Sequence, residues 1–175
     1  MKERHIIAAV ADNKAIGYQN RLIYKISNDM QHFKELTLGN VVIMGRKTYE
    51  SIGSKPLKCR NNIVVTTKGI EIPDSEINNL FQVCSLEEAY ELAETLDGDK
   101  IFVIGGAQLY AAALPYTEWL DFTEVLDSPG NADSYFPTDL TAFLPVKRTS
   151  IYGGKLPYRF ATWRRKDCIS YLKQN

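Results

Sequence analysis

Short apolar segments alternate with helical segments along most of the chain, and this alternation constrains the fold more than any other feature. Buried runs of strand length are His5–Ala11, Val41–Met44, Asn62–Thr66, Phe81–Cys84, Lys100–Ile104 and Trp119–Val125. Strands that alternate with helices form βαβ units, which build a mainly parallel sheet with helices on both faces. The end of the chain differs, because Pro145–Tyr152 and Tyr158–Lys166 predict two antiparallel strands joined through Gly153-Gly154.

The segments between these runs carry start and stop signals for helices. Expected helices run from an N-cap at Ser27 to near Gly39, over Lys47–Ile52, from a capping box at Ser85–Glu88 to about Leu96, and over Ala107–Leu114. The stretch Asp12–Tyr24 is expected to be a long loop, of the kind that forms lids and binding loops.

The predicted fold class is therefore α/β. We expect a doubly wound, mainly parallel eight-stranded sheet with an antiparallel C-terminal strand pair and about four flanking helices. A single domain is expected to span residues 1–175, since the chain shows no linker, repeat or low-complexity tract.

Composition excludes several functional classes. Lys and Arg total 21 and Asp and Glu total 21, so nothing favours nucleic acid or an anionic membrane as a partner. The first apolar run stops at Asp12, too short for a signal peptide or a membrane span. The cysteines Cys59, Cys84 and Cys168 are scattered and the chain has only two histidines, so we expect no metal site and a reduced, cytoplasmic compartment. The basic run Arg164-Arg165-Lys166 is expected to be a solvated strand end.

Three predicted strands end in residues that suit phosphate groups, and ligands of such sheets bind at the carboxyl ends of the strands. These ends are Gly45-Arg46-Lys47-Thr48, Thr66-Thr67-Lys68 and Gly105-Gly106. Each of these strand ends, taken alone, is also typical of a tight turn or a solvent-exposed surface. Together they predict a ligand with several phosphates, such as a dinucleotide, although the GxGxxG fingerprint is absent. Arg46, Thr67 and Lys68 would suit the 2′-phosphate of NADP.

Asp29 is the candidate catalytic group. It lies one turn before Phe33, and Met30, Phe33 and Leu36 recur at a helical spacing that would face a core or a pocket. One carboxylate would therefore lie at the border of an apolar surface. The residues leave a second interpretation open, because an acid in the first turn of a helix often only complements the helix dipole.

The chain resembles the dihydrofolate reductase family nearly from end to end. The segments that carry the resemblance are IIAAVADNKAIG at 6–17, NDMQHFKELT at 28–37, VVIMGRKTYESIG at 41–53, RNNIVV at 60–65, VIGGAQLY at 103–110 and ADSYFP at 132–137. The resemblance implies an NADPH-dependent oxidoreductase that transfers hydride to 7,8-dihydrofolate and yields 5,6,7,8-tetrahydrofolate for one-carbon metabolism and thymidylate synthesis. It also implies diaminopyrimidine or pteridine antifolates as inhibitors, and a monomer.

The same resemblance implies roles for individual residues. Asp29 matches the acid that binds the pterin, and Thr123 matches the threonine that bonds both that acid and the pterin. Arg60 matches the arginine that pairs with the glutamate α-carboxylate of the substrate. Leu22 matches the loop residue that closes over the pocket, Tyr110 the tyrosine near the nicotinamide, and Ile7, Ala9, Phe33, Ile52 and Ile104 the apolar walls.

Cofactor contacts are implied in the same way. They fall on Ala9, Ile16, Gly17, Gly45, Arg46, Lys47, Thr48, Thr66, Thr67, Lys68, Gly105, Gly106, Ala107 and Gln108. The Gly105–Gly106 bond matches the family's cis peptide.

The sequence departs from the family after the loop hydrophobe Leu22. Ile23-Tyr24 stands where the family usually has Pro-Trp, and that tryptophan holds a water near the pterin. We expect the Tyr24 hydroxyl to take over this water, and the lost proline to loosen the loop. A further departure is a residue inserted around Ser54-Lys55, together with Lys58-Cys59 before Arg60.

Two alternatives remain at this level. One is an NADPH reductase of the same fold that acts on a ribosylaminopyrimidine phosphate, which the apolar residues near Asp29 disfavour. The other is a catalytically silent NADP- or folate-binding protein, which the pairing of Asp29 with Thr123 disfavours. Cofactor oxidation that depends on dihydrofolate separates the silent binder from a reductase.

Overall fold

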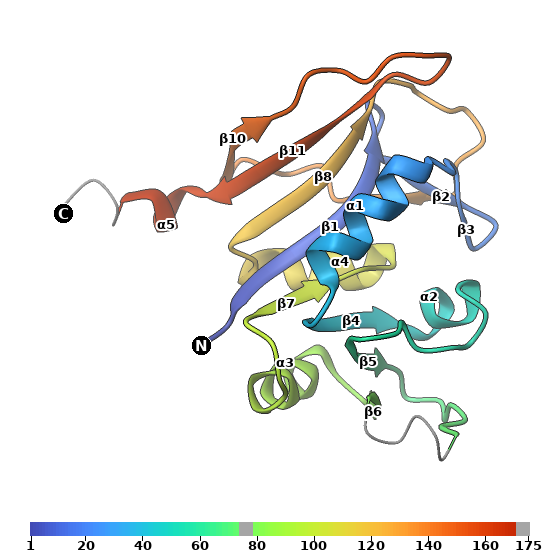
Figure 1. Ribbon diagram of the computed structural model, residues 1–175, viewed down its shortest axis with the longest axis vertical. Helices are drawn as coiled ribbons and strands as arrows, with labels where there is room; N and C mark the ends of the chain where they lie inside the picture. Colours follow the sequence, from blue (N-terminus) through green and yellow to red (C-terminus); the bar gives the residue numbers. More distant parts are fainter. Residues whose placement is uncertain (74–78, 171–175) are drawn as a thin grey trace.

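The computed structural model describes residues 1–73 and 79–170; the predicted domain boundaries 1–175 therefore include residues outside the described ranges. The strands of the main sheet are β1 (Glu3–Ala11), β4 (Val41–Gly45), β5 (Asn61–Val65), β6 (Leu80–Val83), β7 (Lys100–Val103), β8 (Trp119–Val125), β10 (Phe143–Arg148) and β11 (Tyr158–Arg165). Their order in the eight-stranded sheet is β10-β11-β8-β1-β7-β4-β5-β6 (Figure 1).

The pairing confirms the predicted architecture. From β8 to β6 every neighbouring pair is parallel, and β10 and β11 add an antiparallel edge next to β8. The helices are α1 (Ser27–Thr37), α2 (Arg46–Ser51), α3 (Leu86–Thr95), α4 (Ala107–Ala113) and α5 (Lys166–Ser170), with a 3-10 turn η2 (Leu114–Tyr116) after α4.

The two faces of the sheet are covered by different helices (Figure 1). Ile6, Ala8 and Val10 of β1 belong to a core cluster that includes residues of α3 and α4. Ile7 belongs to the opposite cluster, against which side chains of α1 pack. Successive residues of a strand alternate between faces, so the continuously apolar run of β1 can serve both clusters.

The predicted loop at Asp12–Tyr24 is wrong, because this stretch contains a hairpin. Strands β2 (Ala15–Tyr18) and β3 (Arg21–Leu22) pair with each other, and β2 also pairs with β9 (Ser134–Tyr135). Gln19 and Asn20 form the turn with φ of 49° and 58°. Ala15 is fully buried, which explains why so short a strand holds its place.

One predicted helix start is wrong and another is confirmed. Helix α1 begins at Ser27, with extended Ile26 as its N-cap, so Ser27 caps nothing. Helix α3 begins as predicted, because Ser85 is its N-cap and accepts from Glu88 N (3.1 Å). The return bond differs in one detail: Glu88 Oε2 accepts from the N–H of Cys84, one residue before the N-cap (2.9 Å).

The basic run at the end of β11 is not merely solvated. Arg165 Nε donates to Thr117 O (2.6 Å), and its guanidinium lies 4.6 Å from the ring centroid of Phe143. Arg164 lies over the ring of Trp119. These cations attach the end of β11 to β10, to the start of β8 and to the segment before it. Lys166 begins α5 instead of ending a strand.

Candidate active site

Asp29 is half-buried in the first turn of α1 and faces the carboxyl half of β8. Thr123, buried on β8, donates its hydroxyl to Asp29 Oδ1. Burial raises the pKa of Asp29 above its ordinary 3.8, while the Thr123 hydrogen bond and the nearby His32 lower it by smaller amounts. The carboxyl group is therefore a better proton carrier near neutral pH than an exposed aspartate.

Tyr110 and Gly105 close the site next to β1. The Tyr110 hydroxyl donates to Ile7 O (2.9 Å), and burial raises the pKa of Tyr110, with a further contribution from the Asp29 charge. A Cβ built on Gly105, whose φ is +121°, would lie only 3.3 Å from the Tyr110 hydroxyl oxygen. The tyrosine therefore stays protonated and fixed between two strands.

The predicted apolar wall is only partly assembled from core residues. Ile7 is buried, and Phe33 and Ile104 pack against the same cluster. Ala9 is half-buried and pairs in register with Thr123. Ile52 follows α2 and is 38% exposed, and Met30, predicted to face a core or a pocket, is 53% exposed.

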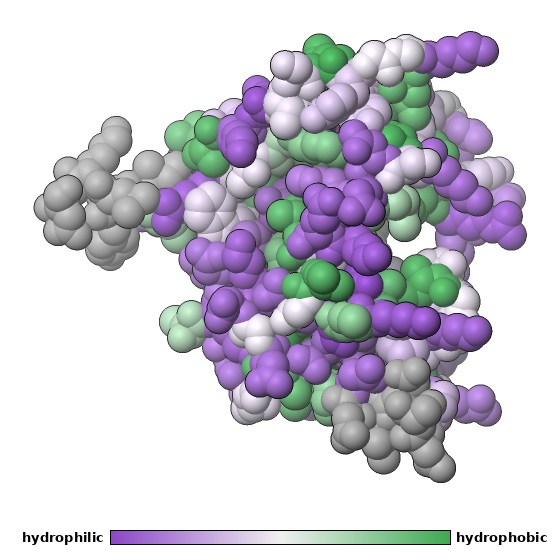
Figure 2. Space-filling model, in the orientation of Figure 1, coloured by the Kyte–Doolittle hydropathy of each residue, from purple (hydrophilic) through white to green (hydrophobic). Residues whose placement is uncertain are grey.

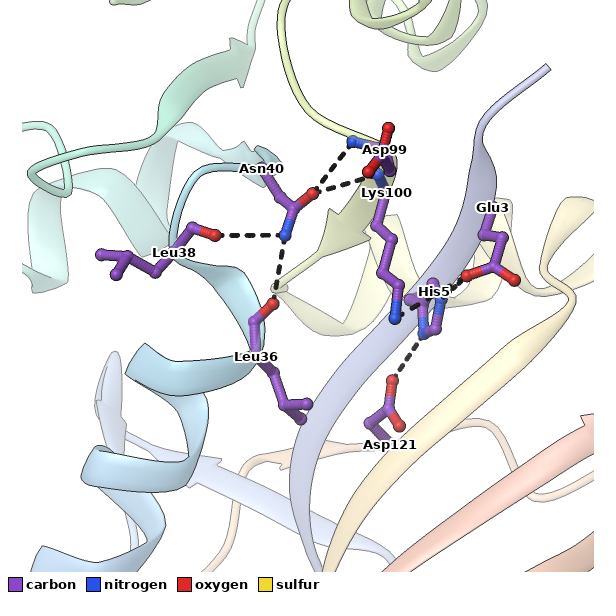
Figure 3. Close-up of polar contacts among 8 residues, drawn as sticks. All are labelled: Glu3, His5, Leu36, Leu38, Asn40, Asp99, Lys100 and Asp121. Atoms are coloured by element: carbon purple, nitrogen blue, oxygen red, sulfur yellow. Dashed lines mark hydrogen bonds and ion pairs between the residues drawn. The ribbon is translucent and has the colours of Figure 1, made fainter.

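Arg60 is attached to the end of α1 that lies away from Asp29. Its Nη1 donates to Thr37 Oγ1 (3.1 Å), and its Nε donates to Lys58 O (2.9 Å). Burial lowers the pKa of Arg60 from its ordinary value, although a guanidinium remains charged. Asn40 fastens the same end of α1 to the start of β7: it donates to Leu36 O and Leu38 O and accepts from the backbone N–H groups of residues 99 and 100 (Figure 3).

The two glycine-ended strands lie side by side, as the phosphate hypothesis requires. Gly45 N donates to Gly105 O (2.8 Å), and the Gly105–Gly106 peptide is cis. Gly45 and Gly106 are the N-caps of α2 and α4, and neither helix start has a side-chain cap. A Cβ on Gly106 would lie 3.7 Å from Thr48 Oγ1, so these glycines leave room between the strand ends.

Cations and hydroxyls surround this edge, but they differ in their attachments. Arg46 is half-buried and pairs with Glu50 one turn later. Thr66 is buried and accepts from Lys68 N (3.0 Å). The remaining predicted contacts are exposed or half-buried at the same strand ends: Lys47, Thr67, Lys68, Ala107 and Gln108.

The hairpin β2–β3 lies beside this edge. Ile16 and Gly17 are in β2, Leu22 ends β3 opposite Gly17, and Leu22 is 56% exposed. Asn20 Nδ2, at the hairpin turn, donates to Lys47 O (3.1 Å) at the start of α2. Figure 2 shows the surface hollowed on this side, between the hairpin region and α2.

The Tyr24 hydroxyl has a partner that the sequence did not predict. This hydroxyl donates to Asp127 Oδ2 (2.8 Å) in the segment after β8. Its oxygen can still accept a hydrogen bond, so the expected contact with a water near the pterin stays a prediction. The departure at Ile23-Tyr24 is therefore accompanied by a contact that the sequence did not predict.

Sequence reasoning also missed Thr37, Asn20 and Asp127, each of which supports a predicted site residue. No sequence signal identifies them, since each acts through a partner brought close by the fold. Among the described residues no group of His, Cys, Asp and Glu side chains could hold a metal ion. Within the same ranges, none of the helices is long and apolar enough to cross a membrane.

Comparison with known proteins gives a consistent result. A family model described as dihydrofolate reductase matches residues 4–165. The dihydrofolate reductase of Bacillus subtilis (strain 168) is 41% identical over 131 residues, which cover 75% of this chain and 73% of that protein. The dihydrofolate reductase of Neisseria gonorrhoeae is 41% identical over 145 residues, 82% of this chain and 85% of the relative. Dihydrofolate reductase HdrB of Haloferax volcanii is 32% identical over 166 residues, 93% and 83% of the two chains.

Proposed function

The chain belongs to the dihydrofolate reductase family and reduces 7,8-dihydrofolate to 5,6,7,8-tetrahydrofolate with NADPH, and we propose that the reaction takes place beside Asp29. The bonded pair of Asp29 and Thr123 is the observation that carries this proposal. It places one desolvated carboxyl group, with a raised pKa, at the carboxyl end of the central strands.

Asp29 is proposed to bind the amino group and ring nitrogen of the pterin. A carboxylate there favours a protonated pterin, so N5 acquires its proton either from Asp29 or from water that the polarised ring can use. Thr123 would hold the carboxyl group in one orientation and present its oxygen to the pterin. Tyr110, fixed by Ile7 O and Gly105, would limit how the reacting rings approach each other.

The chemistry of the strand ends suits NADPH. Gly45, Gly105 and Gly106 leave space where a Cβ would stand, and uncapped backbone N–H groups are present beside them. Arg46, Thr67 and Lys68 would hold the 2′-phosphate, and the other contacts would come from Ala9, Ile16, Gly17, Lys47, Thr48, Thr66, Ala107 and Gln108. When bound, NADPH supplies the hydride for C6 of the pterin.

Arg60 is proposed to pair with the α-carboxylate of the substrate's glutamate. Thr37 and Lys58 occupy two of its five donors, which leaves others for a bidentate contact. Ile7, Phe33, Ile52 and Ile104 would line the path from the pterin to this end, and Leu22 would cover it.

We propose that the protein is a monomer with a single domain and that it works in the cytoplasm, which the scattered cysteines support. We further propose that diaminopyrimidine or pteridine antifolates inhibit it by occupying the pocket beside Asp29.

The test is NADPH oxidation by the purified protein with and without dihydrofolate. Oxidation that depends on dihydrofolate, slower with NADH and almost abolished in Asp29→Asn, is expected. Oxidation that Asp29→Asn leaves unchanged would remove the proposed site. A pterin without the glutamate tail should bypass Arg60, so its KM should not respond to Arg60→Leu.

A further inference from the structure

Residues 23–25 lie between the β2–β3 hairpin and Ile26, the N-cap of α1, and belong to no strand or helix. They lie between two parts of the site, because Leu22 ends β3 and Asp29 is in the first turn of α1. In the described ranges, Tyr24 is the residue of this segment whose side chain makes a hydrogen bond, and its partner is Asp127 at 2.8 Å. This bond therefore connects the segment to the region after β8.

The acceptor of this bond is firmly placed. Asp127 O accepts from Asp12 N at the end of β1 (2.9 Å), and Asp127 N donates to Val125 O at the end of β8 (2.9 Å). The preceding Leu126 N donates to Pro157 O (2.9 Å), just before β11. The Asp127 backbone is thus attached to the ends of the strands that carry Ala9 and Thr123.

The donor is also well defined. Burial and the carboxylate of Asp127 raise the pKa of Tyr24 above its ordinary value of 10.0, so the hydroxyl keeps its proton throughout the neutral range. A hydrogen bond from a hydroxyl to a carboxylate is stronger than one between neutral groups. Ile23 does not restrict the backbone as a proline would, so this bond supplies a restraint that the local sequence lacks.

We propose that Asp127 is a positioning residue of this reductase, which anchors Tyr24 and so holds residues 23–25, with Leu22 on one side and the first turn of α1 on the other. The inference rests on the proposed function of the Asp29 site. Asp127 does not touch the substrate; it acts through Tyr24 on the segment that borders the substrate.

The kinetic test is a double-mutant cycle on Tyr24→Phe and Asp127→Ala, with Ser128→Ala as the matched control in the same exposed stretch. Each single variant should lower the single-turnover rate of hydride transfer or raise the KM for dihydrofolate by about fivefold, the factor expected for one partly exposed hydrogen bond. Because both remove the same bond, the double variant should lose no more than either single variant. Asp127→Asn, which keeps an acceptor oxygen, should lie between the wild type and Asp127→Ala.

Two kinetic results would overturn the proposal. If Tyr24→Phe slows hydride transfer while Asp127→Ala does not, the hydroxyl acts at the pterin and not through Asp127. If the losses add in the double variant, the two residues act independently.

A second readout does not depend on activity. Lys25 is exposed within the segment and offers trypsin a cleavage site. Cleavage after Lys25 should be several times faster in Asp127→Ala and Tyr24→Phe than in wild type and Ser128→Ala, whereas cleavage after Lys47 should not change. Equal rates at Lys25 would contradict the anchor even if the protein proved to be an active reductase. Faster cleavage in a protein without dihydrofolate reduction would instead reject the proposed function and leave the anchor in place.

Discussion

Two carboxyl groups lie against the same face of the β1–β8 pair, and they differ in burial and in hydrogen-bond partner. Asp121 on β8 pairs in register with Ile7, is buried, and has its Oδ2 2.7 Å from His5 Nδ1 (Figure 3). Asp29 reaches the same strand two residues further on, at Thr123, but is only half-buried. Among the described contacts, one neutral hydroxyl is its hydrogen-bond donor.

From this difference we interpret Asp121 as a structural carboxyl group and Asp29 as the carboxyl group of the proposed site. At Asp121 the His5 ring lies against Phe102 and Trp119, so its partner is held in place and the pair joins two central strands. At Asp29, burial outweighs the Thr123 hydrogen bond and the nearby His32 and raises the pKa, which costs stability but keeps a proton available. The carboxyl group near the amino end of β8 therefore has a structural partner, and the one near the carboxyl end belongs to the site that we propose for the substrate.

The largest effect is expected for Asp121, near the amino end of β8. Asp121→Ala should lower the free energy of unfolding by about 3 kcal/mol, since it leaves Nδ1 of the buried His5 ring without its partner, while Nε2 keeps its contact with Glu3. Urea denaturation measures this loss. His5→Ala should cost a similar amount, and the double variant much less than the sum. Below the unfolding transition, kcat/KM should fall far less in Asp121→Ala than in Asp29→Asn. A large catalytic loss without a loss of stability would contradict the structural role of Asp121.

A smaller effect is expected from Thr123→Val, which removes the donor to Asp29 while preserving shape. Its hydrogen bond stabilises the ionised carboxyl group, so its loss should move the midpoint of the pH–rate profile to higher pH and slow hydride transfer by about tenfold. Single-turnover rates across pH check both. Thr162→Val on the neighbouring strand β11, in register with Asp121, is the control and should leave the midpoint unchanged.

The smallest effect is a gain in stability from Asp29→Asn. The folded protein holds the Asp29 proton to higher pH than the unfolded chain, so stability falls as pH rises through the window above the ordinary pKa of 3.8. Asparagine has no such penalty. The variant should match wild type near pH 3 and become the more stable protein by pH 7, as followed by thermal unfolding. A loss of stability at pH 7 would mean that Asp29 supports the helix.

The two carboxyl groups of β8's surroundings also differ in how far the sequence predicts them. The parallel sheet and the glycine-ended strands were predictable, because burial on both faces and backbone approach leave local patterns in β1, β4 and β7. The family resemblance supplied Asp29 and Thr123. The pairing of His5 with Asp121 was not predictable, because it joins residues 116 apart through strand register.

The hairpin and the Tyr24 contact were missed for related physical reasons. Strand β3 has only two residues, and β2 gains its second partner from β9, far along the chain. The Tyr24 hydroxyl found an acceptor 103 residues away, and no local pattern indicates which of many exposed carboxylates will lie within reach.

The most direct measurement is the single-turnover rate of hydride transfer across pH for wild type and Asp29→Asn. The wild-type rate should fall as pH rises through an apparent pKa above the ordinary 3.8 of an aspartate. At pH 7 the variant should be slower by a factor of about 10² or more, the range of general acid catalysis, and should regain rate as the pH is lowered and solvent protonates the substrate. A variant with near-normal rate at pH 7 and an unchanged profile would contradict the assignment of Asp29 and reduce it to a first-turn acid that complements the helix dipole.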